Sequence, residues 1–125
     1  MKKQIVLLLV FTNILFSQNN YSIKYSGYVI SKNGVLSEEY LSDVVMTFNY
    51  KNEGDIKMVY DGDEEEFDLF SKYGKEETDV ADTGQEYTYC KYFSDRVEKI
   101  FTIQIFKGGR NIRIVDGDDY LEYFE

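Results

Sequence analysis

The C-terminal part of the chain alternates between apolar and polar residues, and this alternation limits the possible folds more than any other feature. Two Gly-containing segments, KGGR and DGDD, interrupt the alternation. A period of two residues broken by tight turns is typical of antiparallel strands. Residues 97–124 are therefore predicted to form a three-stranded meander. Its alternating apolar residues are Phe101, Ile103, Ile105, Ile112, Ile114, Leu121 and Tyr123.

The same pattern recurs upstream. Gly27 shifts the alternation from Tyr25 to Tyr28, which predicts a bulge or bend. Asn33-Gly34 is a strong signal for a two-residue hairpin turn. Residues 35–41 are expected to be a loop or a strand edge. Further strands are expected at 21–30, 44–50, 56–60, 67–73 and 85–93.

The remaining segments between these strands are predicted to be turns or loops. Residues 51–54 and 61–63 have turn composition, and Phe67 and Leu69 mark the apolar positions of the strand expected to end near Tyr73. The polar stretch from Gly74 to Gly84 is expected to be a mobile loop, and a functional loop would most naturally lie there.

About eight short strands with hairpin-length connections predict an all-β antiparallel meander. We expect it to curl into a small barrel-like domain of the lipocalin-like, up-and-down kind, with a half-open sheet or a small sandwich as alternatives. The chain has no Pro and no low-complexity linker, so a single domain is expected.

The N-terminus has the pattern of a secretory signal peptide. Basic Lys2 and Lys3 precede an apolar run from Ile5 to Phe16, and the small residue Ser17 follows. This pattern predicts a signal peptide over 1–17 and a β domain over 18–125 in a periplasmic or secreted protein. The apolar run is shorter than the roughly 20 residues of a transmembrane helix, so no transmembrane segment is expected.

Charge and cysteine content narrow the partners. The formal net charge of −9 disfavours nucleic acid and anionic lipid, and favours cations or a basic protein. Cys90 is the only cysteine, so it has no disulfide partner within the chain. It is expected to be buried in a monomer or, alternatively, to link two chains in a dimer.

Several kinds of catalytic site are excluded or poorly supported. The chain has no His, which excludes Ser-His and Cys-His pairs and His-based zinc sites. Asp82-Thr83-Gly84 matches the catalytic triplet of retroviral-type aspartic proteases, but Gln85 follows it and the surrounding stretch is polar. We interpret the triplet as a turn entering a strand, and predict no catalytic residue.

The acidic turns are the candidate metal sites. The candidate ligands of a calcium ion are Asp61, Asp63, Asp116 and Asp118. Calcium needs six to eight oxygen ligands, and the spacing does not match an EF-hand loop. The favoured interpretation is that the two Asp-Gly-Asp segments are tight turns with solvated acids, so no cofactor is expected and calcium is the alternative.

Tyrosine is abundant, with 12 residues in the chain. Tyrosine is common both in ordinary strands and in recognition surfaces. The residues predicted to form a ligand-contacting face are Tyr87, Tyr89, Tyr120 and Tyr123. The favoured interpretation is nevertheless that these side chains only pack within the sheet, and the ligand-contacting face is the alternative.

The chain resembles the small exported β-rich proteins of flavobacteria and their relatives. The resemblance lies in Phe16-Ser17 before Gln18, in the stretches 46–50 and 56–60, and in the tail from Tyr89 to Tyr123. It implies export and a β fold but no activity. We therefore expect a non-enzymatic binding or interaction module for a small ligand or an envelope protein. A small carboxylate-dependent hydrolase and a structural envelope component are the alternatives.

Overall fold

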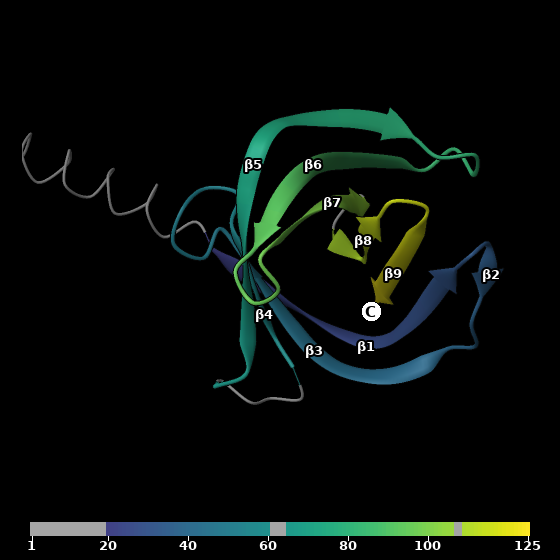
Figure 1. Cartoon of the computed structure of the whole chain (residues 1–125), viewed down its shortest axis with the longest axis horizontal. Coiled ribbons are helices and arrows are strands. Elements are labelled where there is room, and N and C mark those ends of the chain that lie inside the picture. Colours follow the sequence, from purple (N-terminus) through teal and green to yellow (C-terminus); the bar gives the residue numbers. More distant parts are fainter. Residues whose placement is uncertain (1–19, 61–64, 107–108) are drawn as a thin grey trace, which may run out of the picture.

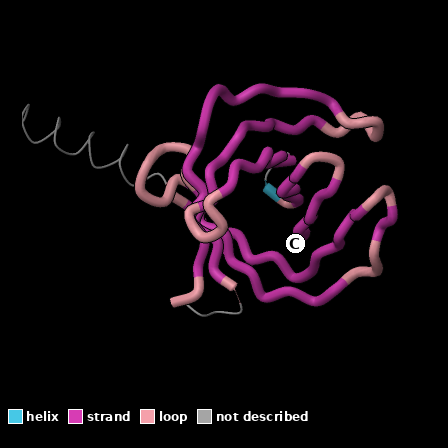
Figure 2. The backbone as a smooth tube through the Cα atoms, viewed as in Figure 1, coloured by secondary structure: helices cyan, strands magenta, loops and turns pink. Residues whose placement is uncertain are grey.

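The computed structural model describes residues 20–60, 65–106 and 109–125. Strands and their connecting loops account for nearly all of this part of the chain (Figure 2). The strands are β1 (Tyr21–Lys32), β2 (Val35–Leu36), β3 (Tyr40–Phe48), β4 (Ile56–Val59), β5 (Phe67–Val80), β6 (Glu86–Ser94), β7 (Lys99–Phe106), β8 (Asn111–Asp116) and β9 (Asp119–Phe124).

The strands form one antiparallel sheet that closes into an eight-stranded barrel. The order is β2-β1-β3-β4-β5-β6-β7-β8-β9, and a further pairing of β1 with β9 closes the barrel, leaving β2 as an extra edge strand. Figure 1 shows β5 and β6 along one side and β1 and β3 along the opposite side, with β7, β8 and β9 between them. The predicted barrel-like all-β fold is therefore confirmed, as is the meander of residues 97–124.

The barrel interior holds the hydrophobic core. The inward-facing side chains of β3 are Val44, Met46 and Phe48, as the alternation predicts. They pair across the sheet with residues such as Tyr25 on β1 and Ile56 on β4. The largest fully buried hydrophobic side chains are Tyr25, Met46, Ile56, Met58, Ile103 and Ile112.

The local predictions for β1 and its turn are confirmed. The register of β1 against β3 shifts between Tyr25 and Gly27, so a β-bulge lies there. The bulge places Tyr25 and Tyr28 on the same side of the sheet, where both rings pack against Tyr123. The hairpin turn between β1 and β2 has positive φ angles at Asn33 (53°) and Gly34 (79°), as a type I′ turn requires.

The predictions around β5 are wrong in two respects. Residues from Gly74 to Val80 were expected in a loop, yet they continue β5, and only residues 81–85 form the turn to β6. Their polar composition misled the prediction because both faces of this part of β5 are exposed, so no alternation is required there. In addition, Asp68 and Phe70 face the core, whereas Phe67 is exposed and Leu69 only half-buried.

Two predictions fall outside the described residues: the signal peptide over 1–17 and the acidic turn containing Asp61 and Asp63.

Strand direction defines two ends of the barrel. Because neighbouring strands are antiparallel, β1, β4, β6 and β8 begin at the same end where β3, β5, β7 and β9 finish. The first end carries Tyr21, the turn of residues 81–85 and the segment before β8. The second end carries Tyr60, the turn between β6 and β7 and the turn between β8 and β9. The buried core lies between these ends.

Candidate functional site

The structure separates the four tyrosines predicted to form a ligand-contacting face. Tyr87 and Tyr89 alternate with the buried side chains of β6, so they lie on the outer surface of the sheet. Tyr123 is buried in the core. Tyr120 points outward, with the Arg113 guanidinium 4.5 Å from its ring centroid, and also borders a cavity at the second end of the barrel. The four residues therefore do not share one surface.

The described acidic turn between β8 and β9 is engaged in ordinary turn contacts. The Lys99 ammonium lies 2.6 Å from an Asp116 carboxylate oxygen, and Asp118 is exposed. Gly117 between them has a φ of 63°. Among the described residues, no group of three or more acidic or cysteine side chains is arranged to hold a metal ion. Calcium binding at the turn between β8 and β9 stays the alternative prediction to a tight turn with solvated acids.

The Cys90 side chain faces the interior of the barrel from β6, next to a bulge in β5. Its side chain is 3% exposed, and its Sγ lies 3.4 Å from the Lys91 carbonyl oxygen and 3.6 Å from that of Gly74. A disulfide needs two sulfur atoms about 2 Å apart. Cys90 cannot approach a second chain this closely while the barrel is intact, so the structure does not support a dimer linked through this residue.

The Asp82-Thr83-Gly84 triplet forms the tip of the β5–β6 hairpin. The Ala81 amide donates to the Gln85 carbonyl, and the Gly84 amide donates to the Ala81 carbonyl, both at 2.8 Å. Gly84 has a φ of 86°, which a glycine adopts without strain. Asp82 is exposed. A turn explains the triplet, whereas an aspartic protease needs two carboxylates sharing a buried site.

The second end of the barrel contains a cavity of about 410 Å³. We call it the apolar mouth, because most of its lining is aliphatic or aromatic. Side chains from β1, β4, β5, β7, β8 and β9 converge on it, so it opens directly from the barrel interior. Its apolar lining residues are Ile30, Met58, Phe70, Val97, Phe101, Ile114 and Leu121.

One carboxylate is buried at the wall of the apolar mouth. Asp68 is 4% exposed; one of its carboxylate oxygens accepts the Ser94 hydroxyl at 2.7 Å, and the other accepts the Arg96 amide at 3.1 Å. The Ser94 hydroxyl also accepts the Val97 amide at 3.3 Å. Asp68 thus fixes the turn between β6 and β7 against β5, and it places a negative charge beside the cavity.

Tyr60 is another polar group of this mouth, which Ser31, Lys32, Asp116 and Asp119 also line. The pKa of Tyr60 is raised to about 12, mainly by burial and then by the nearby Asp68 charge, while Arg96 opposes the rise. The Arg96 guanidinium lies 5.3 Å from the ring centroid of Tyr60. The Tyr60 hydroxyl consequently stays protonated at neutral pH and can donate a hydrogen bond.

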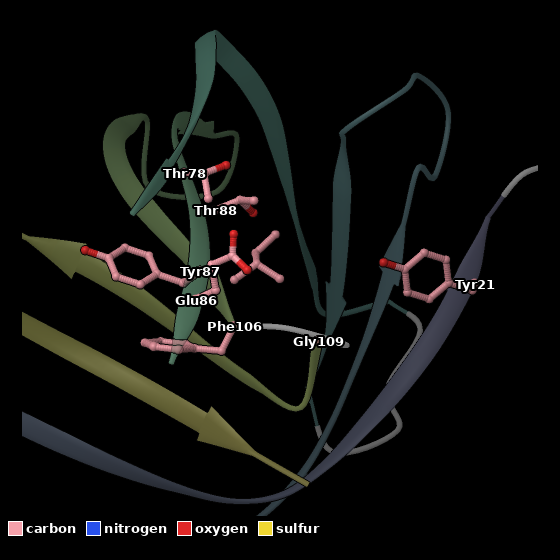
Figure 3. Close-up of a pocket in the computed structure, with 8 residues that line it drawn as sticks. Tyr21, Thr78, Glu86, Tyr87, Thr88, Phe106 and Gly109 are labelled. Carbon is pink, nitrogen blue, oxygen red and sulfur yellow. The ribbon is translucent and has the colours of Figure 1, made fainter. Parts of the chain in front are cut away.

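The first end of the barrel contains a second, separate cavity of about 530 Å³. We call it the hydroxyl mouth; it is lined by Tyr21, Thr78, Glu86, Tyr87, Thr88, Ile105, Phe106 and Gly109. Figure 3 shows Tyr21 on β1 across the cavity from a group on β5, β6 and β7. Its polar side chains are hydroxyls and one carboxylate, so its chemistry differs from that of the apolar mouth.

A buried hydrogen bond holds the backbone beside the hydroxyl mouth. The Tyr25 hydroxyl donates to the Gly109 carbonyl at 2.6 Å. Gly109 has a φ of 72°, and a Cβ at this position would lie 2.6 Å from Ile23 Cδ1. Only glycine fits this close approach without displacing Ile23. Burial raises the pKa of Tyr25, so its hydroxyl keeps its proton for this bond.

Sequence reasoning missed most of the residues that line the two cavities. Asp68 could have been noticed as an acid at an inward position, but the wrong assignment of Phe67 and Leu69 to the core face concealed it. Thr88 lies on the interior face of β6, opposite Tyr87 and Tyr89, and strand alternation is the signal that could have indicated this. The pairing that brings Thr78 beside it lies in the segment predicted to be a loop.

No family model, curated protein or solved structure matches this chain. The described residues contain no helix long and apolar enough to cross a membrane.

Proposed function

We propose that this chain is an exported, non-enzymatic binding protein that holds a small, mostly apolar molecule in the apolar mouth. The observation that supports the proposal most is the cavity itself, which is open to solvent yet lined mainly by aliphatic and aromatic side chains. Its volume of about 410 Å³ lies within the range of roughly 300–1,000 Å³ typical of small-molecule sites. Export is the prediction from residues 1–17.

The polar groups of the apolar mouth suit orientation of a ligand. Small-molecule sites combine an apolar lining with a few fixed polar side chains. Tyr60 offers a protonated hydroxyl, and Asp68 is held by Ser94 and by the Arg96 amide. A ligand with an apolar body and one hydrogen-bonding group would match this arrangement.

A carboxylate-dependent hydrolase is less well supported. Such chemistry needs two carboxylates held together, one of them with a raised pKa. Three carboxylates line the apolar mouth: Asp68 is buried, Asp116 pairs with Lys99 at 2.6 Å, and Asp119 accepts the Asn33 amide at 3.0 Å. Both oxygens of Asp68 already accept hydrogen bonds that fix a turn. This geometry favours binding over hydrolysis.

The proposal is tested by titrating the mature chain with N-phenyl-1-naphthylamine, a neutral dye that fluoresces in apolar sites. We expect saturable fluorescence in the native protein. Leu121→Trp should weaken binding of the dye by about tenfold or more, because the larger ring occupies the cavity and removes contact area.

The matched control is Ile100→Trp. Ile100 lies on β7 but is 43% exposed on the outer surface, so a tryptophan there leaves the cavity unchanged. Equal dye affinity in both variants and the native chain would contradict the proposal. Absence of saturable binding in the native chain would also contradict it, and would favour the structural envelope role.

A further inference from the structure

The hydroxyl mouth contains a pair of threonines placed side by side. Thr78 on β5 and Thr88 on β6 are direct cross-strand partners, and Thr88 shares the inward face of β6 with Cys90 and Tyr92. Within the described part of the chain, neither hydroxyl makes a hydrogen bond to another side chain or to the backbone. Both are therefore available to a ligand in the cavity that they line.

The Tyr21 ring lies across the cavity from this pair (Figure 3). The Tyr21 ring stacks on Phe48 with centroids 5.0 Å apart and planes inclined by 21°, so its position is fixed although it is 51% exposed. Tyr87 and Phe106 also line the cavity and pack with their centroids 5.2 Å apart, but both project from the outer face of the sheet and away from Tyr21 (Figure 3). Figure 3 shows the Tyr21 hydroxyl directed toward the cavity from β1. The rings offer apolar surface with polar groups at its edge.

The charges of the lining limit the ligand class. Glu86 is the one charged side chain among the described residues that line the hydroxyl mouth. A carboxylate repels anions and accepts hydrogen bonds from hydroxyl groups. A ligand that offers several hydroxyl donors and also apolar C–H faces would use both the polar groups and the rings.

From this combination we infer that the hydroxyl mouth is a binding site for a neutral saccharide. Thr78, Thr88 and Glu86 exchange hydrogen bonds with sugar hydroxyls, and the C–H face of the sugar packs on aromatic surface near Tyr21. The cavity of about 530 Å³ falls within the size range of small-molecule sites, roughly 300–1,000 Å³. The inference does not depend on the apolar mouth, because the two cavities lie at opposite ends of the barrel.

Backbone amide NMR of the mature chain, titrated with glucose, N-acetylglucosamine, cellobiose and maltose, tests this inference. We expect at least one of these sugars to shift the signals of Tyr21, Thr78, Glu86 and Thr88 saturably, with a dissociation constant on the order of millimolar, as suits an open site with few hydrogen bonds. Signals of Ile114 and Leu121 at the apolar mouth should not move.

Thr88→Val removes one hydroxyl at constant shape and should weaken sugar binding by about three- to tenfold, the effect of one hydrogen bond. The control is Thr102→Val on the outer surface of β7, where the same change should leave affinity unaltered. Equal affinity in both variants would overturn the inference. It would also be overturned if none of the sugars shifted the Tyr21, Thr78 and Thr88 signals. Binding of glucosamine without binding of neutral sugars would overturn it as well, because Glu86 would then be recognising a cation.

Discussion

The two ends of this barrel share one architecture and differ in chemistry. At the apolar mouth, the inward positions of β8 and β9 carry Ile114 and Leu121, whereas at the hydroxyl mouth the inward positions of β5 and β6 carry Thr78 and Thr88. Sheet pairing explains the difference. β5 pairs with β4 through residues 67–70 and with β6 from Phe70 onward, so beyond Phe70 it pairs with β6 alone.

This comparison shows how strand length sets the solvation of a barrel interior. Where each strand has two neighbours, inward side chains are shielded from water and apolar residues are stabilising. Where β4 ends and β5 continues without a second neighbour, inward side chains meet water and can be polar. The hydroxyl mouth therefore lies beside an incomplete wall. At the apolar mouth, residues 67–69 of β5 also pair with one strand, β4, but the Asp68 hydrogen bonds to Ser94 and the Arg96 amide join β5 to the turn after β6.

The largest effect is expected for Asp68→Ala at the apolar mouth. The substitution leaves the buried Ser94 hydroxyl and the Arg96 amide without their acceptor. We expect the free energy of unfolding to fall by about 3 kcal/mol, since each hydrogen bond to a buried charge contributes about 1.5–3 kcal/mol. Urea denaturation followed by circular dichroism measures it.

The control for Asp68→Ala is Asp43→Ala, which removes only an exposed ion pair with Lys24. That variant should lose much less stability, because exposed ion pairs contribute little. If the two variants were equally stable, the turn between β6 and β7 would not depend on Asp68.

Alkaline pH should destabilise the core between the two mouths. Burial raises the pKa values of Tyr25 and Tyr92 above the usual 10, so the folded chain keeps protons that the unfolded chain loses. The stability that these two tyrosines contribute is constant below pH 10 and falls as pH rises above it, by about 1.4 kcal/mol per pH unit for each protected tyrosine. Urea midpoints measured at increasing pH test this. Unchanged midpoints above pH 10 would show that these hydroxyls titrate freely.

A smaller effect is expected for Tyr25→Phe beside the hydroxyl mouth. The change removes the donor to the Gly109 carbonyl and leaves the buried ring in place. We expect a loss of about 1–2 kcal/mol in the free energy of unfolding. Tyr89→Phe is the matched control, because its bond to Glu77 is exposed, and it should change stability little. If Tyr89→Phe lowered the free energy of unfolding more than Tyr25→Phe did, the hydrogen bond from Tyr25 to Gly109 would not have the stabilising role assigned to it.

The fold could be predicted from sequence because alternation reports which face of a strand is buried. Residues close together in the sequence determine three features: the meander of residues 97–124, the bulge at Gly27 and the Asn33-Gly34 turn. The second half of β5 could not be predicted in this way. Residues 74–80 are exposed on both faces, and their strand conformation comes from pairing with β6, which is a tertiary effect.

The cavities were less predictable than the fold. Tyr123 and Tyr87 are both aromatic residues in strands, yet one is buried in the core and the other lies on the outer surface. Composition does not distinguish them, and the assignment needs the register of every strand around the barrel. Asp68 shows the same limit, since an acid on the inward face is identified only when its partners Ser94 and Arg96 are known.

Native mass spectrometry of the mature protein purified from its natural source tests the central claim most directly. The spectrum of the native chain should show a monomer that carries a defined extra mass of a small molecule. That mass should be absent from Leu121→Trp and present in Ile100→Trp, because only the first variant fills the apolar mouth. A bare monomer in all three spectra, or an extra mass retained by Leu121→Trp, would contradict the assignment of this barrel as a carrier.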